Sequence, residues 1–123
     1  AMPLRYDDLL SPGRIDFCFW QGASGERYVH NVYSLIGCPQ LAAGNFILFA
    51  RDAEGVRRPL HVGHLSNEAP SLNLAEIRRL GATLGASEVH VHLLAKSEAE
   101  RCVIELDLRA GLGLEPDNQP LTA

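Results

Sequence analysis

The sequence predicts an α+β fold, a mainly antiparallel sheet of about five strands with two or three helices. Two observations predict it. All aromatic residues, namely 3 Tyr, 4 Phe and 1 Trp, lie between Tyr6 and Phe49, which gives the first half a strand-like composition. The second half is rich in leucine and alanine and has helical spacing. Hairpin strands followed by helices are typical of this class, and neither half can close a core alone, so we expect residues 1–123 to form a single domain.

The first two elements read as a hairpin. Residues 15–20 alternate apolar and polar side chains, as in a half-buried strand. Residues 21–26 contain two glycines and predict a turn. Residues 27–35 then form the return strand.

A second hairpin follows. Residues 45–51 are almost continuously apolar, which predicts a strand buried on both faces. Residues 52–55 predict a turn, and residues 57–65 a fourth strand. Pro59 lies near the start of that strand, where a missing hydrogen-bond donor is tolerated.

A helix is predicted from Leu72 or Leu74 to Leu84. Asn73 and Glu76 have the spacing of a capping pair, and Gly85 is a typical stop. Arg78 and Arg79 are read as a solvated helix face.

Residues 88–94 are the clearest strand. Successive side chains alternate between faces, so His90 and His92 share one face, opposite to the valines. The final helix is the clearest helix. Ser97 and Glu100 form a capping box, and an apolar stripe at helical spacing predicts the buried face. The stripe comprises Ala99, Cys102, Val103, Leu106 and Ala110.

Ile104 and Leu108 lie on the other side of that final helix. A helix that is apolar on both sides is either sandwiched between layers or placed at an interface. The alternatives are therefore a homodimer through the Ile104/Leu108 face and a helix buried between layers.

Composition bounds the function classes. The net charge of −4 argues against a nucleic-acid partner. No apolar run reaches the ~20 residues of a membrane span, and the N-terminus lacks the pattern of a signal peptide. The 3 cysteines are widely spaced, which suggests reduced thiols. We therefore expect a cytoplasmic protein without membrane partners, with flexible tails at about 1–10 and 115–123.

The stretch 44–108 resembles a GIY-YIG nuclease domain. Gly44-Asn45-Phe46 stands where the family has G-I-Y, and His61-Val62-Gly63 stands where it has Y-I-G. Glu105 lies where the family's metal-binding glutamate is expected on the last helix. The resemblance implies a GIY-YIG-like second half in which His61 and Glu105 are the catalytic residues.

The departures from the family pattern concern its tyrosine and its arginine. Phe46 has no hydroxyl group, and residues 66–77 contain no arginine. The resemblance therefore implies a diverged domain that is weak or inactive as a nuclease. His61 can still carry a proton, because the unperturbed pKa of histidine is ~6.5.

The chain has 5 histidines, four of them on two predicted strands. His90 and His92 together with Glu105 could bind a divalent metal such as Zn²⁺, Mn²⁺ or Fe²⁺. The simpler interpretation is a solvated strand face. His61 and His64 are three residues apart, so a regular strand places them on opposite faces.

Three functions remain open from sequence. The first is the diverged GIY-YIG-like domain, which requires His61 and Glu105 to face one cleft. The second is a non-enzymatic domain that binds a ligand or a protein. The third is a histidine metal site with hydrolytic activity, which requires His90, His92 and a further ligand in one coordination sphere.

Overall fold

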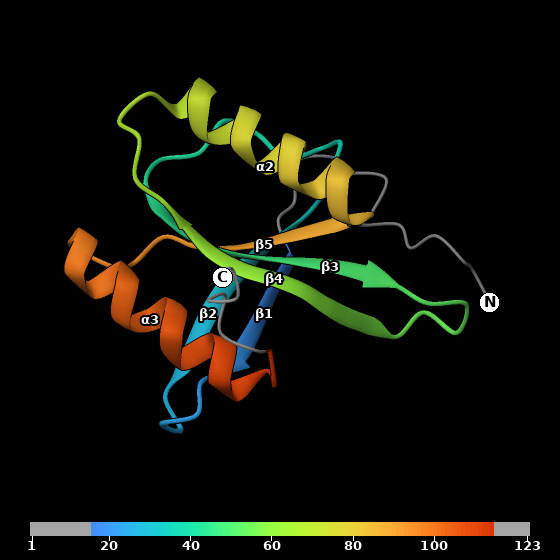
Figure 1. The fold of residues 1–123 in the computed structure, drawn as a ribbon, viewed down its shortest axis with the longest axis horizontal. Coiled ribbons are helices and arrows are strands. Elements are labelled where there is room, and N and C mark those ends of the chain that lie inside the picture. Colours follow the sequence, from blue (N-terminus) through green and yellow to red (C-terminus); the bar gives the residue numbers. More distant parts are fainter. Residues whose placement is uncertain (1–15, 115–123) are drawn as a thin grey trace, which may run out of the picture.

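The computed structural model describes residues 16–114, which form one antiparallel sheet with a helix on each face (Figure 1). The strand order is β1-β2-β5-β3-β4. The predicted α+β class is confirmed by these five strands and by two helices in the described part of the chain. Both predicted tails lie outside the described residues. The elements are β1 (Asp16–Gln21), β2 (Arg27–Ser34), β3 (Gly44–Arg51), β4 (Arg57–Leu65), α2 (Pro70–Leu84), β5 (Glu88–His92) and α3 (Glu98–Gly111).

The two predicted hairpin turns are confirmed. Gly25 and Gly55 have φ angles of 93° and 82°, a left-handed conformation that glycine adopts without steric cost. The Gly55 amide donates to the carbonyl oxygen of Asp52 at 2.9 Å. These turns pair β1 with β2 and β3 with β4 as antiparallel neighbours.

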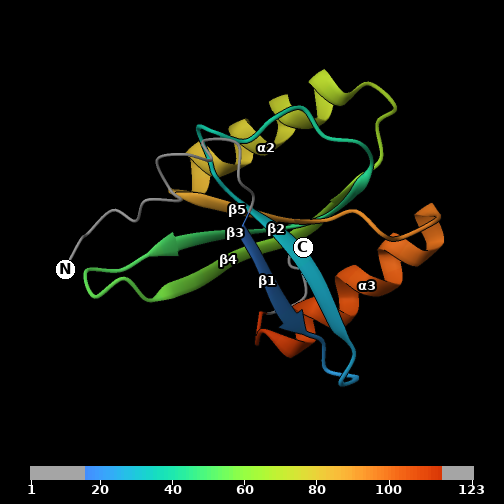
Figure 2. The same cartoon turned by 180° about the vertical axis from the view of Figure 1, so that it is seen from behind.

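The last strand of the chain joins the two hairpins. β5 lies between β2 and β3 and pairs with both of them in the antiparallel sense (Figure 2). Neither hairpin pairs directly with the other, so the sheet is complete only when β5 is in place.

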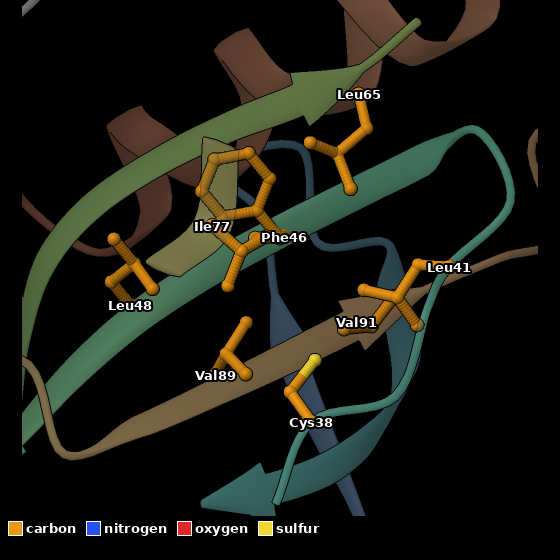
Figure 3. Close-up of a cluster of buried hydrophobic side chains, with 8 residues drawn as sticks. All are labelled: Cys38, Leu41, Phe46, Leu48, Leu65, Ile77, Val89 and Val91. Atoms are coloured by element: carbon orange, nitrogen blue, oxygen red, sulfur yellow. The ribbon is translucent and has the colours of Figure 1, made fainter. Parts of the chain in front are cut away.

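One core lies between the sheet and α2 (Figure 3). Side chains from β3 and β5 point into it and meet Ile77 of α2, which is completely buried. The cluster comprises Cys38, Leu41, Phe46, Leu48, Leu65, Ile77, Val89 and Val91.

A second core lies between the opposite face of the sheet and α3. Ile47 and Phe49 of β3 are completely buried there, against Leu108 of α3. Since a helix covers each face, β3 is buried on both sides, and the prediction from its continuous apolar run is confirmed. The cluster comprises Ile47, Phe49, Val62, Ile104 and Leu108.

Helix α2 begins earlier than expected, and Asn73 does not cap it. Pro70 occupies the first turn, where its missing amide proton is not needed, and Ala69 is the N-cap without a side-chain bond. Asn73 lies inside the helix, is buried, and its amide donates to the carbonyl oxygens of Leu41 and Asn67. The predicted stop is confirmed at the C-terminal end, where Gly85 has a φ of 78°.

Helix α3 buries the face opposite to the predicted one. Ser97 caps it as expected and accepts from the Glu100 amide. The predicted stripe, however, faces outward, because Val103 and Leu106 are each 65% exposed. Helical spacing identifies which apolar residues share a side of the helix, but it carries no information about their size or about the residues that pack against them. The sheet instead receives Ile104 and Leu108.

The burial of Ile104 and Leu108 bears on the predicted homodimer. Both side chains are buried against the protein's own sheet. The alternative, a face buried between layers, describes them. Homodimerisation itself stays a prediction. No helix among residues 16–114 combines the length and apolarity needed to cross a membrane.

Candidate functional site

The two residues that the GIY-YIG resemblance implies as catalytic lie on opposite faces of the sheet. His61 is paired with Leu48 in the β3–β4 register, and its ring lies 5.7 Å from that of Phe46, on the α2 side. Glu105 belongs to α3, on the other side. His64 is paired with Asn45, which also faces α3. The sequence expectation that His61 and His64 face opposite ways is therefore met, and Glu105 lies with His64.

His90 and His92 share a face, as predicted, but they are not solvated. Their residues are 0% and 5% exposed, because Trp20 and Phe49 pack against His90 and Tyr28 packs against His92. The indole nitrogen of Trp20 donates to Nδ1 of His90 at 2.9 Å, and Nε2 of His90 donates to Glu88 at 3.0 Å. Burial lowers the pKa of His90. Both ring nitrogens of this histidine are therefore committed to structural hydrogen bonds.

His30, which the sequence interpretation did not use, joins the same buried row. Its Nδ1 donates to the carbonyl oxygen of Tyr28 at 2.9 Å, and its ring lies 5.5 Å from that of His92. Burial is the main cause that lowers the pKa of His30 to about 3. His92 donates from Nδ1 to Val29 at 2.8 Å. This buried histidine row, His30, His90 and His92, is a polar layer on the same face of the sheet as the second core.

Glu88 anchors one end of the buried histidine row. Burial alone would raise its pKa, but hydrogen bonds outweigh burial and lower the pKa to about 2. Its two carboxylate oxygens accept bonds of 2.8 Å from Arg51 and Arg57. An ionised carboxylate with three such donors is stable at the edge of the core.

His64 has a different environment, which we call the His64 centre and define as His64, Glu98, Cys102 and Glu105. Nδ1 of His64 lies 2.5 Å from Glu105, and Nε2 lies 2.8 Å from Glu98. Because an ionised carboxylate only accepts, the two contacts favour the imidazolium form of His64, in which both ring nitrogens donate. Burial opposes this charge, yet the two carboxylates raise the pKa of His64 above its ordinary value.

Local structure explains the His64 centre. β4 ends at Leu65, which places His64 at the rim of the sheet. The cap at Ser97 starts α3 at Glu98. Residues spaced by three or four lie on one helix side, so Glu98, Cys102 and Glu105 line the same side of α3. The Arg109 guanidinium holds Glu105 in turn, at 3.0 Å.

Within residues 16–114, the ligand atoms of His64, Glu98 and Cys102 form a group that could hold a metal ion, all within 4.8 Å of one another. The predicted set of His90, His92 and Glu105 is not brought together, since Glu105 pairs with His64. Sequence reasoning missed Glu98 and Cys102. Their i, i+4 spacing was visible, but the side of α3 that faces β4 was not.

A polar groove of about 570 Å³ adjoins His64 between the end of β4 and the first turns of α2. Arg79 lines it, which the sequence interpretation treated as merely solvated. Arg78 points elsewhere and donates to the Ile36 carbonyl oxygen at 3.2 Å. The polar residues of the lining are His64, Ser66, Asn67, Asn73, Glu76 and Arg79.

Comparison with known proteins adds no further constraint. No family model, curated protein or solved structure matches the chain. The GIY-YIG resemblance therefore rests on its short motifs alone, and the geometry of the site is what bears on the function.

Proposed function

We propose that this protein is a non-enzymatic domain that binds a small polar ligand and does not cleave phosphodiesters. One observation carries the proposal. His61 and Glu105, the two residues that the resemblance implies as catalytic, lie on opposite faces of the sheet. Acid–base and metal groups must each lie within ~3 Å of the atoms on which they act. Two groups separated by a sheet cannot act on one ester.

Other features support a binding role. Phe46 is 1% exposed and has no hydroxyl to offer a substrate. The net charge of −4 disfavours the backbone of a nucleic acid. The groove beside His64 presents a cation at Arg79, a carboxylate at Glu76 and a hydroxyl at Ser66. Such a lining suits a small molecule that carries both charge and hydrogen-bonding groups.

A nuclease assay tests the first half of the proposal. The wild-type protein is incubated with plasmid DNA, short RNA and an activated phosphodiester, in Mg²⁺ or Mn²⁺. His61→Ala and Glu105→Gln variants serve as comparisons. We expect the same background rate for all three proteins. Metal-dependent cleavage that both substitutions abolish would overturn the proposal.

A binding experiment tests the second half. Amide chemical shifts are followed while nucleotides, amino acids and short peptides are added to the full chain. We expect saturable shifts at Ser66 and Asn67 with at least one compound class, and weaker binding by Arg79→Ala. Arg58→Ala is the matched control, because Arg58 is an exposed arginine outside the groove. Shifts confined to other surfaces, or none with any class, would contradict the proposed site.

A second candidate function, metal-dependent hydrolysis, is favoured by the clustering of His64, Glu98 and Cys102. A zinc ion with three protein ligands keeps a position for water, whose pKa it lowers toward 7. Hydrolysis of activated esters with and without added Zn²⁺ tests this candidate. We expect the zinc-dependent rate to fall to background in Cys102→Ser.

A further inference from the structure

We propose that the His64 centre is a zinc site in which His64, Glu98 and Cys102 are the protein ligands and Glu105 positions the histidine. These ligands differ from the set that the sequence suggested. The inference rests on the metal-dependent candidate function and deepens it, and it does not rest on the ligand proposed for the groove, although His64 lines both sites.

The first argument is the placement of Nε2. Both ring nitrogens of His64 face carboxylates, and Nε2 lies 2.8 Å from Glu98. The imidazole and the Glu98 carboxylate are therefore already held at a distance that one small ion or proton can bridge. A divalent cation at the same place would bond Nε2 through its lone pair and Glu98 through an oxygen. Zinc therefore replaces the Nε2 proton.

The second argument is the nature and spacing of the donors. The three ligand atoms lie within 4.8 Å of one another, and the Glu98 and Cys102 side chains are exposed, hence free to adjust. Around a tetrahedral Zn²⁺, ligand atoms are about 3.3 to 3.8 Å apart, so small rotations suffice. A thiolate beside an imidazole and a carboxylate favours zinc over Mg²⁺ or Ca²⁺, which prefer oxygen ligands.

The third argument is the support behind the ligands. Metal-bound histidines donate their other ring nitrogen to a carboxylate, which fixes the ring orientation. Glu105 already has this position at 2.5 Å from Nδ1. Arg109 holds Glu105 at 3.0 Å and also donates to the Val62 carbonyl oxygen, which ties the support to β4. The ring is thus oriented before any metal arrives.

Charge balance also fits. Zn²⁺ displaces the proton on Nε2 of His64 and the thiol proton of Cys102, and both protons pass to solvent. The bound cluster then contains one divalent cation, the Glu98 carboxylate and the Cys102 thiolate, which sum to zero. Water from solvent takes the fourth position.

Zinc titration of the full chain against a chromophoric chelator tests the proposal, with the metal content counted by mass spectrometry. We expect one Zn²⁺ per chain, and affinity lower by at least about tenfold in Cys102→Ser and in His64→Ala. Cys18→Ser is the matched control, since Cys18 lies in β1 outside the centre. It should bind zinc as the wild type does. The exposed position of Cys102 makes its serine variant safe for folding, should His64→Ala unfold.

Cobalt substitution separates ligands from the positioning residue. The wild type loaded with Co²⁺ should show thiolate-to-cobalt charge-transfer absorption, absent in Cys102→Ser. Glu105→Gln should keep this absorption while its affinity falls by about 10–100-fold. Absence of stoichiometric zinc from the wild type, or unchanged binding by Cys102→Ser, would overturn the site. Neither result would alter the nuclease or groove experiments.

Discussion

The histidine residues lie in three different environments, although their side chains are identical. His30, His90 and His92 are buried in a polar row on the α3 side of the sheet, and burial lowers the pKa of His30 and of His90. His61 lies against Phe46 on the opposite face. His64 lies at the rim between two carboxylates. Register separates His61 from the other four, because each one-residue step along a strand reverses the face. Position within the sheet separates His64, at the rim, from the buried row on the same face.

The buried side chain of Asn73 contributes to the stability of the fold. Its buried amide donates to two main-chain carbonyls at 2.9 Å, which joins α2 to the loops before β3 and after β4. Asn73→Ala leaves both acceptors without this donor, so we expect the free energy of unfolding to fall by about 2–4 kcal/mol. Urea denaturation measures it. Thr83→Ala, at an exposed position of α2, should change stability by less than about 0.5 kcal/mol. Equal losses in the two variants would show that Asn73 has no bridging role.

The orientation of α3 is a property of a whole element. Ile104→Ala and Leu108→Ala remove side chains buried against the sheet. We expect each to lower the free energy of unfolding by about 2–5 kcal/mol. Val103→Ala and Leu106→Ala remove apolar side chains from the exposed side of the same helix, and each should cost less than about 0.5 kcal/mol. Larger losses in the Val103 and Leu106 variants than in the Ile104 and Leu108 variants would show that the side of α3 predicted from spacing is the buried one.

The sequence could not choose between the two sides of α3. Apolar residues occur all around this helix, and their number favours the side with Val103 and Leu106. The sheet accepts the other side, where Ile104 and Leu108 fill the second core. Flanking charges on that side are paired, as Glu105 is with Arg109. Packing and charge pairing outweigh the count of apolar residues.

The buried histidine row makes the stability of the whole molecule depend on pH. The pKa of His30 is about 3 in the folded state, against an ordinary value near 6.5, and the pKa of His90 is also lowered. Below pH 6.5 the unfolded chain therefore binds more protons than the folded one. The His30 contribution makes stability fall by up to about 1.4 kcal/mol per pH unit as the pH decreases from 6.5 toward 3, and His90 acts in the same direction.

Urea midpoints between pH 7.5 and 4.5 check this expectation, within the range set by those pKa values. The His30→Leu variant should show a shallower decline, because one of the buried titrating groups is removed. A decline in His30→Leu that is as steep as in the wild type would contradict the lowered pKa of His30, since the raised pKa of His64 acts in both proteins. Glu88, whose pKa is about 2 in the folded state, also stabilises the fold, and this contribution starts to be lost only when the pH falls to its ordinary pKa of 4.5.

Local sequence patterns were sufficient to predict the fold class and most of the helices and strands of this protein. Alternation, turn glycines and the Ser97 cap are local signals, and the elements that they predicted are present in the described residues. The sequence also placed His90 with His92 and separated His61 from His64, because strand alternation is local too.

Which distant residues come into contact depends on how the elements pack, and local sequence patterns do not reveal that packing. β5 inserts between two hairpins that lie earlier in the chain, and α3 crosses the sheet face opposite to α2. These two choices bury the histidine row, separate His61 from Glu105 and bring Glu98 and Cys102 to His64. The placements of β5 and α3 depend on how well surfaces from distant parts of the chain pack together. The sequence pattern within one strand or helix contains no information about the element against which it will pack.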